Sequence, residues 1–87
     1  MGNFLGGSAY AMARQIAEGF MLVSQTTLRR LTRHDLTQLQ LEIQKILTDE
    51  RANQPAPDDV KALQARNRKI SRISNASQVI QGRLSGR

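Results

Sequence analysis

Cysteine is absent from this 87-residue sequence. Its absence excludes disulfide bonds, thiolate zinc sites and cysteine nucleophiles, and it is typical of proteins from a reducing compartment. Only three residues are aromatic: Phe4, Tyr10 and Phe20. Because aromatic rings grip planar ligands and stack on unpaired bases, we expect neither a stacking pocket nor single-strand recognition by stacking.

Long apolar runs are also missing. The longest, at residues 20–23, is far shorter than the ~20 residues that a membrane-spanning helix requires. The first residues contain no basic stretch of the kind that opens a secretory signal. We therefore expect no transmembrane segment and no cleavable signal peptide, and a protein that is either cytoplasmic or incorporated into an assembly. The localisation stays open beyond that.

Residues with catalytic or metal-binding chemistry are few. The chain has one histidine, His34, and its only paired acidic residues are 49–50 and 58–59. A hard cation needs six or more oxygen ligands from an ordered loop, and the spacing around these pairs does not provide them. We therefore predict that the protein is not an enzyme and uses neither a metal nor another cofactor.

Acidic residues are absent from the last third of the chain. Residues 61–87 contain seven Lys or Arg and no Asp or Glu, whereas residues 1–60 contain six basic and seven acidic residues. The formal net charge of +6 therefore comes from the last third. On a helical wheel, five of its cations share one side: Lys61, Arg68, Lys69, Arg72 and Arg83.

This basic face has two interpretations. One is a solvated surface, and the other is a docking face for an acidic partner or for a nucleic-acid backbone. If all five cations reached phosphates of duplex DNA, the binding constant would fall with salt with a log–log slope of about −4 to −5. No helix-turn-helix spacing or zinc-finger signature accompanies the charge.

What the chain does contain is helical periodicity. Between Pro57 and Leu84, aliphatic residues recur at steps of three and four, with Arg66 and Ser77 among them. A second, shorter stripe begins at Leu36. Stripes with this spacing are typical of helices that pack together. We predict that the following residues form the helix–helix interface: Leu39, Ile43, Ile46, Leu63, Ile70, Ile73 and Ile80.

A proline loop at residues 53–59 separates the two stripes. Pro55 disfavours helix in the residue before it, and Pro57 suits a first helical turn. The sequence thus predicts an all-α fold, an antiparallel helical hairpin of long amphipathic helices. We expect one small domain with five segments: a glycine-rich leader (1–7), a helical arm (8–52), the proline loop (53–59), a basic helix (60–82) and a tail (83–87).

The helical arm has its own stripe, which starts after a predicted N-cap at Ser8 and includes Phe20 on the inner face. Asp35 and Gln38 have capping-box spacing, which predicts a break near His34 and three helices in all. The alternative is one continuous helix as far as Arg51. Gly19 either permits close backbone approach or is a tolerated weak point.

Several apolar residues of the arm lie outside its stripe, so one packing partner cannot cover them all. We predict that they form an assembly interface with residues of the leader: Phe4, Leu5, Tyr10, Met21, Leu22 and Leu28. The layout of a leading helix, a proline-containing loop and a polar-rich second helix resembles that of small secretion-needle and rod subunits, which polymerise through such hairpins.

We therefore expect a non-enzymatic structural or interaction subunit of a larger protein assembly, such as a filament, a virion or a secretion complex. Its expected partners are copies of itself or other subunits. The alternative is a protein that binds the nucleic-acid backbone through the basic face.

Overall fold

The computed structural model describes residues 7–86, which form helices and connecting segments with no strand among them. The predicted all-α class is confirmed. The helices follow in the order α1 (Ala9–Ala17), α2 (Gln25–Leu28), α3 (Arg33–Ala52) and α4 (Val60–Ser85). The molecule is elongated, with principal extents of 44 × 25 × 19 Å.

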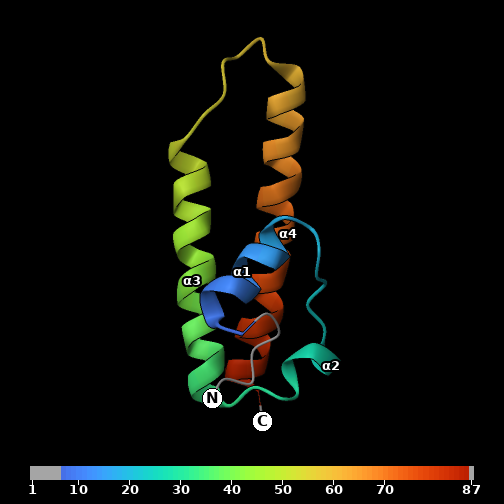
Figure 1. Ribbon diagram of the computed structural model, residues 1–87, viewed down its shortest axis with the longest axis vertical. Helices are drawn as coiled ribbons and strands as arrows, with labels where there is room; N and C mark the ends of the chain where they lie inside the picture. The colour runs from blue at the N-terminus through green and yellow to red at the C-terminus, as the bar shows by residue number, and fades with distance from the viewer. Residues whose placement is uncertain (1–6, 87) are drawn as a thin grey trace.

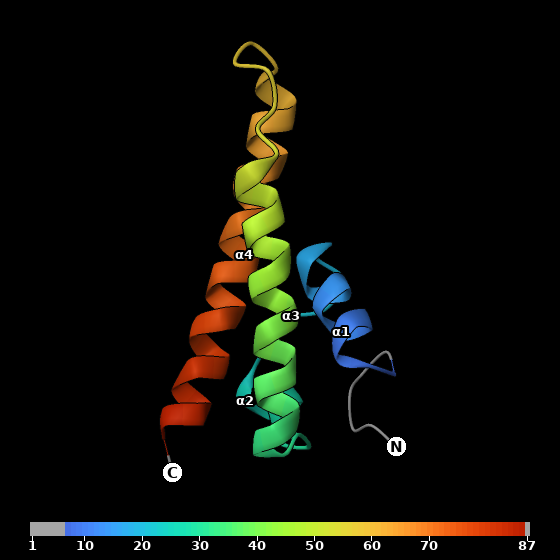
Figure 2. The ribbon, with the colours of Figure 1, turned by 90° about the vertical axis from the view of Figure 1, so that its left-hand side faces the viewer.

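Helices α3 and α4 lie side by side along the long axis, run in opposite directions and are joined by residues 53–59 at one end (Figures 1 and 2). Polar side chains also connect them. Gln40 Nε2 donates to the Ser77 carbonyl oxygen at 3.3 Å, and Gln44 Nε2 lies 3.0 Å from Ser77 Oγ. Among the residues predicted for the helix–helix interface, Leu63 and Ile70 are half-buried and the others are buried: Leu39, Ile43, Ile46, Ile73 and Ile80.

Helix α1 packs across one face of this pair, in the half of the molecule away from residues 53–59 (Figure 2). Its residues Met12, Ala13, Ile16 and Ala17 belong to a core cluster that also includes residues of α3 and α4. The predicted two-helix hairpin did not contain this extra layer. Helix α1 thus covers a side of α4 that would face water in a simple two-helix hairpin.

The helical arm predicted for residues 8–52 is interrupted twice, at residues 18–24 and 29–32, so the helix count differs from the expected three. The second interruption ends at a capping box. Thr32 Oγ1 accepts from the Asp35 amide, and the Asp35 carboxylate accepts from the Thr32 amide, both at 3.1 Å. The predicted break near His34 thus lies close to the observed one, but Thr32 is the cap and Asp35 is the third helical residue.

Helix α4 continues past Gly82, where the sequence predicted its end, to Ser85. The Gly86 amide donates to the Gly82 carbonyl oxygen at 2.9 Å. An interior glycine costs only ~1 kcal/mol in a helix, and the fully buried Ile80 holds this part of α4 against the core. Within residues 7–86, none of the helices combines the length and the apolar character that crossing a membrane requires.

Candidate interaction surface

Helix α1 ends at Ala17, and Gly19, the residue after its C-cap Glu18, has a φ of +87° in the left-handed region. The Gly19 amide donates to the Ile16 carbonyl oxygen at 3.1 Å, and the Phe20 amide donates to the Gln15 carbonyl oxygen at 2.9 Å. These two bonds form a Schellman motif, in which glycine is the favoured residue because it lacks a Cβ. The chain therefore leaves the helix here, although the apolar periodicity continues beyond it.

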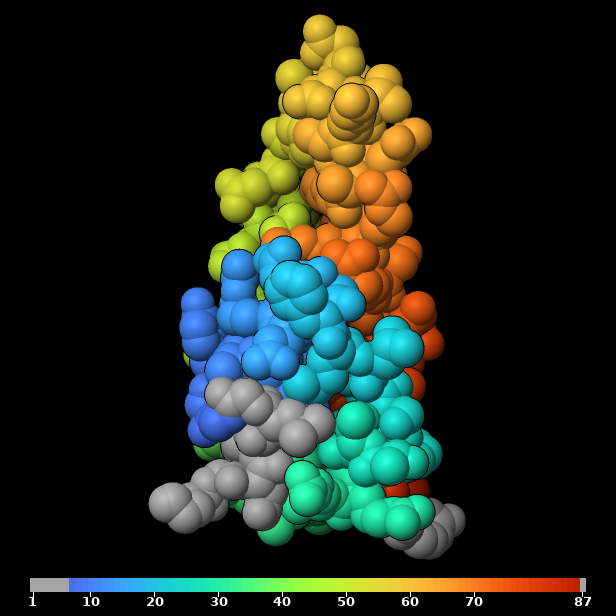
Figure 3. All heavy atoms as spheres, turned by 45° about the vertical axis from the view of Figure 1, so that its right-hand side comes forward, coloured from blue at the N-terminus to red at the C-terminus, as the bar shows by residue number. Residues whose placement is uncertain are grey.

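The segment after Gly19 presents two large apolar side chains to solvent. Phe20 and Leu22 are each 81% exposed. The prediction that Phe20 belongs to the inner stripe was wrong, because the left-handed turn takes it out of helical register. Residues 18–24 lie on the surface beside α4 (Figure 3). We refer to Phe20 and Leu22 together as the apolar knob.

The rest of the segment is anchored. Met21 and Val23 are half-buried against the core. Ser24 begins α2 with a capping box, in which its amide donates to Thr27 Oγ1 at 2.7 Å and its hydroxyl accepts from the Thr27 amide at 3.3 Å. Leu28, which was predicted to contact a neighbouring molecule, is fully buried in the core of its own chain. The knob therefore projects from a segment that is fixed at both ends.

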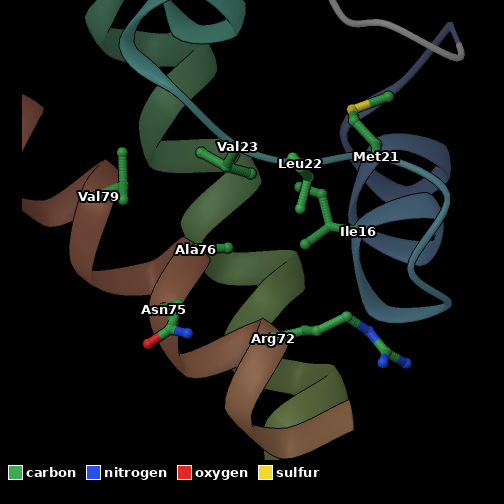
Figure 4. Close-up of a pocket in the computed structure, with 8 residues that line it drawn as sticks. All are labelled: Ile16, Met21, Leu22, Val23, Arg72, Asn75, Ala76 and Val79. Carbon is green, nitrogen blue, oxygen red and sulfur yellow. The ribbon is translucent and has the colours of Figure 1, made fainter. Parts of the chain in front are cut away.

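A hollow of about 130 Å³ lies beside the knob, between α1, residues 21–23 and α4 (Figure 4). A cavity of roughly 150 Å³ accommodates a benzene ring, so the hollow has the size class of one aromatic side chain. Its lining is mainly aliphatic, with Arg72 and Asn75 at one side: Ile16, Met21, Leu22, Val23, Arg72, Asn75, Ala76 and Val79.

Arg72 reaches from α4 to the end of α1. Its Nε and Nη2 donate to the Ala17 carbonyl oxygen at 3.1 and 2.7 Å. A Cβ at Gly19 would lie 3.4 Å from the Arg72 guanidinium carbon. The cation thus occupies the negative end of the α1 dipole and supplies donors to a helix-terminal carbonyl.

Two further residues of the predicted basic face are also held within the chain. Lys69 Nζ lies 3.3 Å from a Glu18 carboxylate oxygen and 3.0 Å from one of Glu50, and its side chain is only 18% exposed. Arg83 Nη1 donates to Gln25 Oε1 at 3.0 Å. With Arg72, three of the five cations therefore connect α4 to other parts of the fold.

The remaining two cations of that face, Lys61 and Arg68, are exposed and have no hydrogen-bond or ion-pair partner within residues 7–86. Arg66 in the apolar seam is half-buried. Its Nε donates to the Glu50 carbonyl oxygen at 2.9 Å, and Nη2 lies 3.4 Å from that of Arg51. Arg66 therefore caps the end of α3 through backbone carbonyls.

Of the assembly residues predicted from the sequence, Tyr10 is 60% exposed on α1, while Phe4 and Leu5 lie outside the described residues. Sequence reasoning placed Leu22 outward but missed Phe20. The signal that could have found it is Gly19, read as a helix C-cap.

The described part of the chain contains no cluster of three His, Asp or Glu residues able to hold a metal ion. His34 is exposed at the start of α3. What this geometry offers is a contact surface, an apolar knob beside an apolar hollow. The chain matches no protein-family model, no curated protein and no solved structure.

Proposed function

We propose that this protein is a non-enzymatic interaction subunit of a larger protein assembly, and that the apolar knob and the adjoining hollow form its contact with a second copy of the chain. The observation that carries this proposal is the 81% exposure of both Phe20 and Leu22 on an anchored segment. Neighbouring exposed apolar side chains of this size mark interaction sites in soluble proteins. In this proposal the antiparallel pairing of α3 and α4 is the rigid frame.

A second copy fits because the knob and the hollow lie next to each other on one surface. Around a two-fold axis, Phe20 of each copy can enter the hollow of the other, which gives a self-complementary contact. The surface that leads to the knob has charges of both signs, since Arg14 and Glu18 form an ion pair at 3.4 Å whose side chains are 44% and 43% exposed. A two-fold partner can therefore place unlike charges opposite each other at the rim.

The expected free energy of association indicates a reversible contact. Burying a Phe or Leu side chain contributes about 1.5–3 kcal/mol, so four mostly exposed side chains in a dimer contribute roughly 5–10 kcal/mol. Association costs about 4–15 kcal/mol in lost translational and rotational freedom. The knob is therefore needed in full, and its loss should abolish the contact rather than weaken it slightly.

The experiment compares two double variants of the full chain by size-exclusion chromatography with light scattering over a range of concentrations. Phe20→Ser with Leu22→Ser removes the knob. Leu41→Ser with Val60→Ser is the matched control, because these side chains are exposed singly, at 57% and 59%, on α3 and α4. We expect a concentration-dependent increase in mass for the wild type and the control, and monomer at every concentration for the knob variant.

Helical circular dichroism should be unchanged in both variants, since neither removes a buried side chain. A wild type that stays monomeric at the highest concentration would contradict self-association. Unfolding of the knob variant would instead assign these side chains to an internal core.

A further inference from the structure

A different concentration of charge lies at the end of the molecule opposite residues 53–59. Arg29, Arg30 and Arg33 stand at the junction of α2 and α3, and all three are exposed. None of their side chains has a hydrogen-bond or ion-pair partner in the part of the chain that the structure describes. Figure 3 shows this junction, in teal to green, at the end of the molecule far from the yellow loop. We call these three residues the arginine end.

The core explains why these arginines point outward. Leu28, Leu31 and Leu36 are 0%, 7% and 3% exposed, and they belong to the same core cluster. Arg29 and Arg30 lie in the sequence between Leu28 and Leu31. Arg33 lies between Leu31 and Leu36. Since the leucines fix the inner side of the junction, the arginines are held on the outer side.

The neighbouring residue types suit one kind of ligand. Thr32, His34 and Gln38 are exposed around the arginines, and the hydroxyl of the exposed Thr37 donates to the Arg33 carbonyl oxygen at 3.0 Å. Arginine, hydroxyl and amide side chains are those that contact phosphate oxygens in nucleic-acid complexes. The 20-residue helix α3 also begins here, so the positive end of its dipole adds to the potential.

We propose that the arginine end binds the phosphate backbone of duplex nucleic acid, independently of sequence. The large exposed apolar side chains lie elsewhere, and residues 25–38 contribute none. A membrane-inserting surface needs such side chains, as does the centre of a protein interface. The single acidic residue here, Asp35, accepts a hydrogen bond from the Thr32 amide at 3.1 Å as part of the helix cap. This proposal does not rest on the proposed function, because the knob and the arginine end share no residue.

The test measures binding of the full chain to a short mixed-sequence DNA duplex by fluorescence anisotropy at several salt concentrations. With three phosphate contacts, the binding constant should fall with salt with a log–log slope of about −3. Substituting Arg29, Arg30 and Arg33 by Gln should bring the slope close to zero and lower the affinity at low salt by at least about tenfold. Substituting the same three by Lys should preserve the slope, because the charges remain.

The matched control substitutes Arg51, Lys61 and Arg68 by Gln. This variant has the same net charge as the first, and its changes lie at exposed positions nearer the other end of the molecule. It should bind with the wild-type slope. Equal losses in the two Gln variants would overturn the proposal, since binding would then follow net charge alone. Absence of duplex binding by the wild type would overturn it directly, and binding only to vesicles of equal parts phosphatidylcholine and phosphatidylserine would assign the arginines to a lipid surface.

Discussion

Replacing Arg72 by Met should destabilise the fold through the end of α1, a helix of only nine residues. The Ala17 carbonyl oxygen receives two hydrogen bonds from the guanidinium, and Ala17 is fully buried. Methionine preserves much of the side-chain volume but donates nothing. The substitution therefore leaves this carbonyl group buried without its donors.

The expected cost follows from these contacts. A hydrogen bond to a charged group contributes about 1.5–3 kcal/mol, and a buried acceptor left without a partner costs about 1–3 kcal/mol. These terms overlap, so we expect a loss of roughly 2–4 kcal/mol in the free energy of unfolding. For a domain of this size the melting temperature should fall by roughly 8–30 °C. Urea unfolding followed by circular dichroism measures the first quantity, and thermal unfolding the second.

Arg68→Met is the matched control, because Arg68 lies one turn earlier on α4 and is exposed without a partner among the described residues. It should change the unfolding free energy by no more than about 0.5 kcal/mol. Arg72→Lys should give an intermediate loss, since lysine keeps the charge but not the planar fork. If the Arg72→Met and Arg68→Met variants unfold at the same urea concentration, the hydrogen bonds from Arg72 to the Ala17 carbonyl oxygen do not stabilise the fold.

Three other predictions follow from single contacts. Gly19→Ala should cost about 1–2 kcal/mol in urea unfolding, because alanine is strained at a φ of +87°, and an unchanged midpoint would argue against the Schellman turn. Ile73→Ala should lower the free energy of unfolding by about 2–5 kcal/mol, because Ile73 is 1% exposed. Ile70→Ala should lower it by clearly less, because Ile70 is only half-buried, and the reverse order would contradict the packing of α4. Lys69→Met and Glu50→Gln should show a coupling of about 0.5–1 kcal/mol in a double-mutant cycle, given their 3.0 Å ion pair, whereas additive losses would mean that the pair contributes nothing.

The sequence predicted the all-α class because helical periodicity is a local property. The stripes around Ile43 and Ile73 are regular, and the prolines between them prevent one continuous helix. These residues are buried in α3 and α4. Where stripe and helix-breaking residues agree, the sequence alone places the elements closely.

The first third of the chain was harder to predict, because its apolar spacing continues through two interruptions. Ile16 and Leu31 are both buried, but they reach the core from α1 and from the residue before the Thr32 cap. A periodic pattern cannot distinguish one long helix from short helices that return to the same core. Gly19 marks the first interruption, and its φ depends on where the chain must go next. The exposure of Phe20 follows from that turn, so the knob could not be found from periodicity alone.

Which cations of the basic face stay exposed was also hard to predict from the sequence. A helical wheel places Lys69, Arg72 and Arg68 together, and in a two-helix hairpin all three would face water. Once α1 lies across α4, its buried end needs a donor and the carboxylate of Glu18 is brought close to α4. Lys69 and Arg72 satisfy these groups, whereas Arg68, which precedes both of them in α4, stays exposed to water. Net charge can be counted from the sequence, but which cations stay exposed without a partner depends on the fold. Among the described residues these cations include the three arginines at the junction of α2 and α3.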